Sequence, residues 1–168
     1  MVDFGDLRLF ARPNLVPLSL VVFGATRAAD EAAALSRIST PEFDSTREVV
    51  LEGDASSLSP RAAAQSVAPD VVSAERFAAR VSLSQAGYLL QREVWYPGWR
   101  ARVDGVETPV LRADALFRAV PLSAGDHDVE VFFDSASFKR GAFVTLGALV
   151  VIIILLAWRP IMRLRVQA

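Results

Sequence analysis

The sequence contains no cysteine and only one histidine, His127. Without cysteine the chain has no disulfide, no thiol nucleophile and no thiolate ligand for a metal. One histidine is too few for a metal site built on imidazole nitrogens. The net charge of −1 creates no field that attracts nucleic acid, and no run of Lys or Arg precedes the long apolar segment. We therefore expect no metal, no cofactor and no nucleic-acid partner.

Catalytic motifs are also missing. No GxSxG-type nucleophile elbow is present, and no glycine-rich phosphate loop follows a strand and opens a helix. His127 stands between Asp126 and Asp128 at the start of a predicted strand, where we expect it to be structural. The two aspartates resemble only a fragment of a calcium-binding loop. The residues therefore assign no catalytic role.

One long apolar run is present, Gly141–Trp158, with eighteen residues and no charge. As a helix it spans roughly 27 Å, close to the ~30 Å hydrocarbon core of a bilayer. Eleven of its residues are Phe, Val, Leu or Ile, and together they favour insertion by roughly 5 kcal/mol. A buried helix or central strand of a soluble core is the alternative, but such elements rarely need so long a run. The run predicts a transmembrane helix, followed by a cytoplasmic tail at 159–168.

Flanking charges predict the orientation of this helix. Arg159, Arg163 and Arg165 follow it, whereas only Lys139 and Arg140 lie just before it. The positive-inside rule therefore favours a cytoplasmic C-terminus, with the soluble part extracytoplasmic. The chain does not open with a signal peptide. Either earlier helices of a longer protein carry it across, or the domain is cytoplasmic on a C-terminal tail anchor.

Residues 1–52 have the pattern of a small α/β unit in β-β-α-β order. Asp30 is suited to cap the helix, because its carboxylate can accept from free N–H groups of the first turn. Residues 53–69 are rich in Gly, Ala, Ser and Pro, which predicts a linker with a short helix at 61–65. The elements expected in the first unit are strands at 7–10, 18–23 and 48–52 and a helix at 31–39.

Residues 70–134 alternate between short strands and turn signals, which predicts an antiparallel β-sandwich. Pro97-Gly98 suits a type II turn, and Asp104-Gly105 is a strong hairpin signal. An interfacial loop is expected at 135–140. The expected strands are 77–83, 88–95, 99–103, 106–112, 116–122 and 127–133. The fold class is therefore mainly β, with a small α/β N-terminal unit, an antiparallel β-sandwich and one C-terminal transmembrane helix.

Three aromatic residues flank the Pro-Gly turn: Trp95, Tyr96 and Trp99. They are candidates for sugar contact, because indole rings on a tight turn offer a stacking platform. They are equally suited to filling the end of the sandwich core, since large aromatics dominate small cores. The sequence leaves both interpretations open.

Two further groups of residues are candidates for contacts with a membrane. Arg100, Arg102 and Arg118 lie on neighbouring predicted strands and can contact headgroups or phosphate, at about 1 kcal/mol each near an anionic surface. A solvated face of ion pairs explains them as well. Gly141, Thr145 and Ala148 form a small-residue stripe along the apolar run, which would let another helix approach closely.

Several motifs together resemble one family. The sequence is similar to the C-terminal region of YfhO-family bacterial membrane proteins over about residues 7–158, most densely over 95–127. The stretch Asp44–Glu52 resembles the segment that precedes this region in the family. The remaining motifs are Trp95–Gly105 (WYPGWRARVDG), Thr108-Pro109, Phe117–Pro121, Ala124–His127, and Ser137-Phe138 before Gly141.

The resemblance implies a large polytopic protein of GT-C-like architecture. Such proteins look like glycosyltransferases that use lipid-linked sugars outside the membrane, on cell-envelope glycopolymers or glycolipids. Their catalytic acidic residues are expected in an early extracytoplasmic loop, which has no counterpart here, so no catalytic residue is transferred. The resemblance also suggests an internal or fragment start at Met1.

The expected function is therefore that of a non-catalytic extracytoplasmic module with the last transmembrane helix of such an enzyme. Its expected partners are the lipid bilayer, the upstream transmembrane helices, and a glycan or lipid-linked sugar. The alternative is a stand-alone membrane-anchored β-sandwich that binds carbohydrate or a protein partner.

Overall fold

The structure is a computed structural model. It describes residues 2–4, 7–9, 17–59 and 62–165, with the side chains of 17–59, 62–135, 141 and 143–156. The chain divides into two compact units, Met1–Phe133 and Asp134–Ala168. In the first unit, β1 (Val2–Phe4) and β2 (Leu7–Leu9) form an antiparallel pair. The predicted strand at 7–10 is thus found at 7–9, and Phe10 lies outside the described residues.

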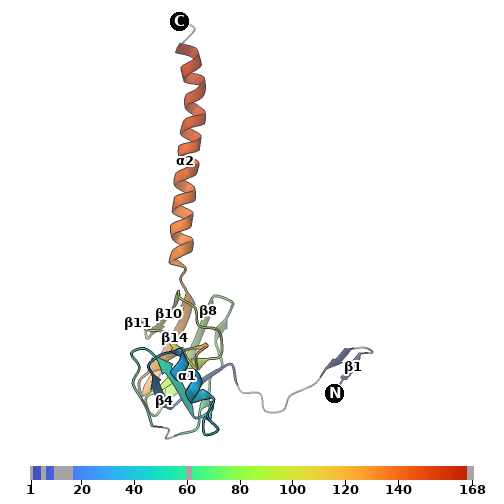
Figure 1. The fold of residues 1–168 in the computed structure, drawn as a ribbon, viewed down its shortest axis with the longest axis vertical. Coiled ribbons are helices and arrows are strands. Elements are labelled where there is room, and N and C mark those ends of the chain that lie inside the picture. Colours follow the sequence, from blue (N-terminus) through green and yellow to red (C-terminus); the bar gives the residue numbers. More distant parts are fainter. Residues whose placement is uncertain (1, 5–6, 10–16, 60–61, 166–168) are drawn as a thin grey trace. The chain divides into compact units, whose positions relative to one another are not determined.

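Two larger β-sheets form the described body of the first unit (Figure 1). The five-stranded sheet has the order β11-β10-β14-β8-β7, and the seven-stranded sheet has the order β4-β5-β12-β13-β9-β3-β6. The strands of the five-stranded sheet are β7 (Val71–Val72), β8 (Arg76–Leu83), β10 (Trp99–Val103), β11 (Val106–Thr108) and β14 (Gly125–Phe133). Those of the seven-stranded sheet are β3 (Ser19–Val22), β4 (Gly24–Ala28), β5 (Glu48–Glu52), β6 (Gln65–Ser66), β9 (Gly87–Gln91), β12 (Leu111–Ala113) and β13 (Phe117–Leu122). The prediction of a mainly β protein is confirmed.

The N-terminal strands and the sandwich strands share one sheet. β3 pairs antiparallel with β9, and β5 meets β12 where Leu51 lies opposite Ala113. β4 and β5 pair in parallel, as two strands joined by a crossover helix do. The seven-stranded sheet is therefore mixed, and it contains strands from both 1–52 and 70–134, a point that the sequence left open.

The described residues of 53–69 are bound to this sheet at two places. Leu58 and Ala25 exchange two backbone hydrogen bonds of 2.8 Å, and β6 pairs with β3. Val67 is 7% exposed and joins the core. Backbone pairing therefore holds the stretch that its composition predicted to be a linker. Of the helix expected at 61–65, residue 61 lies outside the described residues, and 62–65 are not helical.

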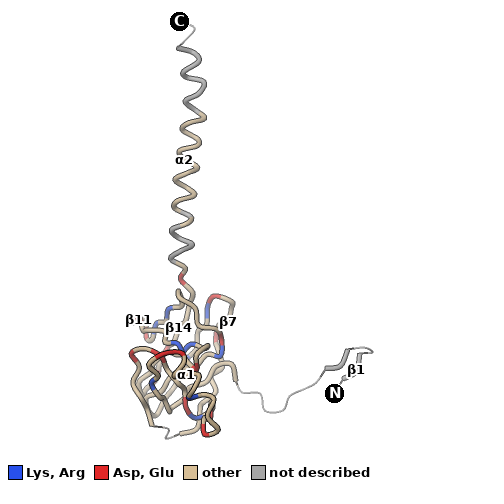
Figure 2. The backbone as a smooth tube through the Cα atoms, in the orientation of Figure 1, with Lys and Arg blue, Asp and Glu red and all other residues tan. Residues whose placement is uncertain are grey.

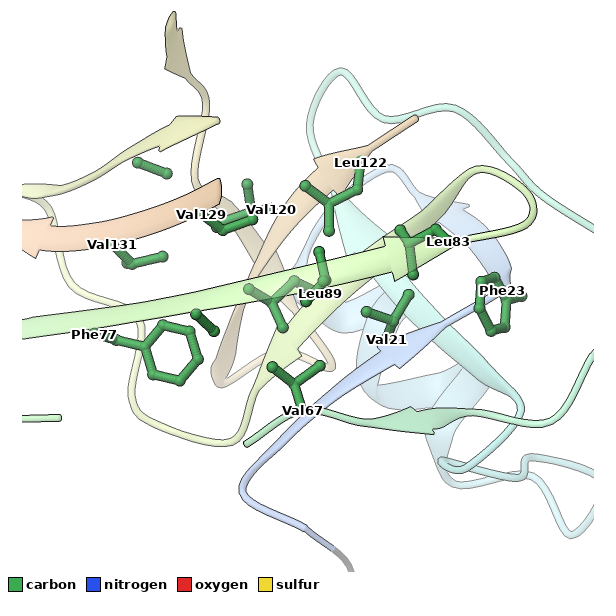
Figure 3. Packing of buried hydrophobic residues seen from close by; sticks show 13 residues of the cluster. Val21, Phe23, Val67, Phe77, Leu83, Leu89, Val120, Leu122, Val129 and Val131 are labelled. Carbon is green, nitrogen blue, oxygen red and sulfur yellow. The ribbon is translucent and has the colours of Figure 1, made fainter. Parts of the chain in front are cut away.

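The main core lies between the two sheets (Figure 3), where side chains of β3, β9 and β13 face those of β8 and β14. On β8, Ala79, Val81 and Leu83 are buried, whereas Arg80 and Ser82 are exposed, as the alternation predicted. β3 contributes to both faces of its sheet. Its Val21 belongs to the core between the sheets and its Val22 to a second cluster on the opposite face.

Helix α1 (Glu31–Ile38) forms where the sequence predicted it. The Asp30 carboxylate accepts a hydrogen bond of 2.8 Å from Ala33 N and so caps the first turn. Ala34 is fully buried and packs with Ala28 and Val50, so the helix covers β4 and β5 (Figure 1).

The hairpin between β10 and β11 also forms as predicted. Val103 pairs with Val106, and both Asp104 and Gly105 have positive φ, of 53° and 79°, as a type I′ turn requires. The strand expected at 106–112 is instead broken at Pro109. Because proline donates no ladder hydrogen bond, β11 ends in one sheet and β12 begins in the other.

The second unit holds helix α2 (Ala136–Arg165), with 30 residues. The helix includes 136–140, where the sequence predicted a loop. Every described side chain from 143 to 156 is exposed, and Figure 2 shows this part of α2 without a charged residue. Within the described part of the chain, no helix is both long enough and apolar enough to cross a membrane. The predicted span Gly141–Trp158 includes positions 142, 157 and 158, whose side chains lie outside the described residues.

Candidate functional site: an aromatic edge of the sandwich

The predicted aromatic residues lie where β9 leads into β10. Trp99 N donates to Tyr96 O at 3.3 Å, and Gly98 has φ of +119°. This closes the turn at Pro97-Gly98 that the sequence predicted, since the third residue of a type II turn needs positive φ. The turn brings Tyr96 and Trp99 to the same end of the five-stranded sheet.

Phe133, the last residue of β14, lies against both of these rings. The Trp99 ring meets it edge-on, with centroids 5.4 Å apart and planes at 62°. The Tyr96 ring meets it with centroids 6.3 Å apart and planes at 42°. These are the separations that aromatic pairs prefer. We call Trp95, Tyr96, Trp99 and Phe133 the aromatic edge.

Arg118 of β13 lies beneath Trp99 and crosses from one sheet to the other. Its side chain is 2% exposed, and its Cζ is 3.5 Å from the centre of the Trp99 ring. Its Nε donates to Gln91 Oε1 at 3.0 Å, and a second nitrogen donates to Glu93. Its buried Nη1 has no hydrogen-bond acceptor among the described residues, and the negative face of the indole lies against the guanidinium carbon. Burial lowers the pKa of Arg118, and the Glu93 carboxylate opposes that effect.

Other side chains of the protein therefore cover much of the Trp99 ring. Arg118 stacks on its ring, Phe133 meets it as well, and the ring packs on the main core. Trp95 is half-buried, and its indole N–H donates to Val110 O at 3.3 Å. Tyr96 differs from both, because it is 63% exposed. Of the three predicted sugar contacts, Tyr96 offers the most open ring.

The two other arginines predicted to contact headgroups lie on β10 and are half exposed. Arg100 pairs with Glu107 at 3.2 Å. Arg102 pairs with Glu130 at 3.6 Å and lies 4.7 Å from the centre of the Phe132 ring. The structure thus places both in ion pairs at the surface, while Arg118 is inside. Headgroup contact by Arg100 and Arg102 stays a prediction.

A second polar cluster surrounds His127 at the opposite end of β14. Its Nδ1 lies 2.7 Å from Asp104 Oδ2, and its Nε2 lies 3.0 Å from Ser123 Oγ. Asp104 is fixed in turn, since its other oxygen accepts from Asp128 N at 2.8 Å. The hydrogen bond to Asp104 is the largest cause that raises the pKa of His127. The cluster ties the β10–β11 turn to the turn before β14.

The contacts from Ser123 through His127 to Asp104 resemble those of a catalytic triad. Other features favour a structural role. The Ser123 carbonyl also lies 3.2 Å from Nε2, so it competes with Oγ for that nitrogen. A hollow of about 330 Å³ beside the histidine is lined by Asp104, Asp126 and Asp128 among others, and not by Ser123. A nucleophile has to face the space that a substrate would occupy. Among the described residues, no group of acidic and imidazole side chains is arranged to hold a metal ion.

On α2, Gly141, Thr145 and Ala148 are all exposed. The Thr145 hydroxyl donates to the Gly141 carbonyl at 2.9 Å, so it is satisfied within the helix. The stripe therefore presents a surface of small residues, and its contact with another helix stays a prediction.

Sequence reasoning missed the partners of the aromatic edge. Gln91 and Glu93 hold Arg118 in place, and Phe133 supports Tyr96 and Trp99. The alternation of 127–133 groups Phe133 with Val129 and Val131 on one face of the predicted strand, and this was the signal available for its position. No family model, curated protein or solved structure matches this chain.

Proposed function

We propose that α2 lies in the bacterial cytoplasmic membrane and that the sandwich is a non-catalytic module on its extracytoplasmic side. We propose further that the module belongs to a YfhO-like polytopic glycosyltransferase, which modifies cell-envelope glycopolymers or glycolipids with a lipid-linked sugar. The lipid bilayer, the upstream helices of the parent enzyme, and a glycan or lipid-linked sugar are its proposed partners.

The exposure of the apolar side chains of α2 carries the membrane placement. Eleven large apolar residues from Phe143 to Leu156 have exposed fractions of 48 to 75%. A helix that is apolar on all sides needs an apolar surrounding, because each exposed side chain costs free energy in water. Lipid or neighbouring transmembrane helices provide that surrounding. The uncharged sequence of Gly141–Trp158 supports the placement independently of the described side chains.

The glycosyltransferase assignment rests on the sequence resemblance alone. The non-catalytic role is supported by Arg118, whose cation is held by Gln91 and the Trp99 ring, and by the competition for Nε2 at His127. The stripe Gly141, Thr145 and Ala148 is the surface of α2 that suits an upstream helix.

Single cysteines test the topology cleanly, because the natural chain has none. Ser57→Cys lies on an exposed loop of the sandwich, and Gln167→Cys lies in the tail. With both variants introduced at the native locus, we expect an impermeant maleimide to label Ser57→Cys in intact cells. Gln167→Cys should react only after lysis. The reverse pattern, or a chain released from membranes by alkaline carbonate, would contradict the proposal.

The link to glycosylation is tested by deleting the region that encodes residues 17–168 at the native locus. We expect one glycosyl substituent to disappear from the envelope glycans, as measured by mass spectrometry, and to return on complementation. An unchanged glycan profile would contradict this part of the proposal and leave the topology result standing.

The second candidate function is a stand-alone, membrane-anchored sandwich that binds carbohydrate. The open ring of Tyr96 favours it, since exposed aromatic rings are the usual stacking surface for sugars. Titration with envelope oligosaccharides should then change the tryptophan emission of the wild-type chain and not that of Tyr96→Ser. No response in either chain would exclude carbohydrate binding at this ring.

A further inference from the structure

We infer that the aromatic edge rests on the lipid headgroups of the bilayer that holds α2. This inference rests on the proposed membrane placement of α2 and specifies which end of the sandwich meets the lipid. It assigns Tyr96 and Trp95 to the membrane surface.

Covalent connection is the first argument. Phe133 ends β14 and Ala136 begins α2, so the chain between them reaches at most ~10 Å. Five further helical residues, which advance about 7 Å, lead to the uncharged run at Gly141. Any side chain that touches Phe133 is therefore tethered close to the point where the apolar helix begins.

The second argument is the apolar surface around Phe133. Tyr96 contacts it and is 63% exposed. The neighbouring Trp95 N donates to Leu116 O at 2.8 Å, and Leu116 is 49% exposed. Val94 is exposed as well, at 59%. Exposed large apolar residues thus adjoin the aromatic edge, where water is a poor solvent for them.

The third argument is the kind of residue found there. Tyr and Trp are enriched at membrane–water interfaces, because one end of each ring is apolar and the other forms hydrogen bonds. On the adjacent strand, Arg100 lies opposite Phe132 and has an exposed side chain, which suits phosphate contact. These rings, with one half-exposed arginine beside them, match a headgroup layer better than they match a protein interior.

Tryptophan fluorescence in vesicles tests the inference, since the chain has three tryptophans. The double variant Trp99→Phe/Trp158→Phe leaves Trp95 as the sole reporter. We reconstitute the full chain in vesicles of phosphatidylcholine and phosphatidylglycerol that carry bromine either near the headgroup or deep in the acyl chains. We expect roughly twofold or greater quenching of Trp95 by the shallow bromine relative to the deep one, as for an interfacial residue.

A matched reporter at the other end of the sandwich controls for collisions with the vesicle. Leu83 pairs with Gly125, which lies eight residues before Phe133 on β14, or about 27 Å away. Ser84 is the exposed residue that follows Leu83. In a chain with all three tryptophans replaced by Phe, Ser84→Trp should show no quenching by either lipid. Equal quenching at both positions would overturn the inference.

Added to the Trp99→Phe/Trp158→Phe chain, the variant Tyr96→Ser/Leu116→Ser removes the exposed apolar contacts and leaves Trp95 as reporter. We expect the shallow quenching to fall at least twofold, while the thermal midpoint in detergent and flotation with vesicles stay unchanged.

If the chain floats with vesicles but Trp95 is never quenched, this inference fails and the membrane placement stands. If the chain does not float, both fail. If soluble oligosaccharide alters Trp95 emission and lipid does not, the edge is a sugar site and the inference is overturned.

Discussion

Arg118 carries a positive charge into the boundary between the two sheets, where its surroundings are almost entirely protein. Its partners are the Gln91 amide, the Glu93 carboxylate and the face of Trp99. We predict that Arg118→Ala lowers the free energy of unfolding by about 3 kcal/mol, because it leaves buried polar groups unpaired and removes the support of Trp99. Arg118→Met should lose less, since it keeps the volume. Chemical denaturation of the full chain in mild detergent measures both, and equal losses would show that the charge and its hydrogen bonds matter and the volume does not.

His127 and Asp104 make a pH-dependent pair. The Asp104 carboxylate raises the pKa of His127 above 6.5, so the pair stabilises the fold fully below 6.5 and less as pH rises through the folded value. The same hydrogen bond lowers the pKa of Asp104 below 3.8, so its stabilisation is present above 3.8 and is lost in stronger acid. We predict that the thermal midpoints of wild type and His127→Gln differ most between about pH 4 and pH 6.5 and converge toward pH 9.

Asp126→Asn is the control for this prediction. Asp126 adjoins the histidine in sequence and is the smallest of the causes that raise its pKa. We expect the Asp126→Asn difference from wild type to change little across the same pH range. A His127→Gln difference that did not depend on pH would contradict the charged pair.

At the scale of the elements, Gly87 shows how closely β9 approaches β3. A Cβ added to Gly87 would lie 2.8 Å from Val21 Cγ1 and 3.0 Å from the backbone oxygen of Val22. We predict that Gly87→Ala costs about 1–3 kcal/mol of unfolding free energy, because backbone has to move to admit it. Gly147→Ala on α2, where nothing lies within 4 Å, should not destabilise the sandwich. Denaturation curves that coincide for Gly87→Ala and wild type would refute this packing.

The sequence predicted those elements that are determined by residues close to one another in the chain. Alternation identified β8, and Asp30 and Asp104-Gly105 identified a helix start and a hairpin. β4 was missed, because its residues GATRA are small and its strand character comes from pairing with β5 across α1. The sheet position of 53–69 was missed for the same reason. The turn of the aromatic edge was predictable from Pro97-Gly98. The contacts of Trp99 with Arg118 and Phe133 were not, because those residues come from strands distant in sequence.

A local backbone feature explains one failure of alternation. The alternation of 116–122 groups Leu116 with Val120 and Leu122 on one face of the predicted strand, yet Leu116 is 49% exposed whereas the other two are buried. Asp114 and Ala115 have positive φ, of 48° and 59°, so the chain turns before β13 begins. Asp114 is held there by a hydrogen bond from Val50 N of 2.8 Å, and burial raises its pKa to about 6. A buried aspartate in a turn thus redirects a residue that strand periodicity alone had grouped with Val120 and Leu122.

For the whole molecule, the division into two units predicts how the chain behaves without α2. Every residue of the three core clusters lies between Leu20 and Val131, and none belongs to α2. We predict that a chain ending at Ser135 stays folded and soluble without detergent, with a thermal midpoint within a few degrees of the full chain. The full chain should need detergent, because the apolar side chains of α2 remain exposed.

Circular dichroism and size-exclusion chromatography of the two chains test this. A truncated chain that aggregates or unfolds would show that α2 contributes to the core of the sandwich. A full chain that stays monomeric in buffer would remove the physical basis for placing α2 in lipid.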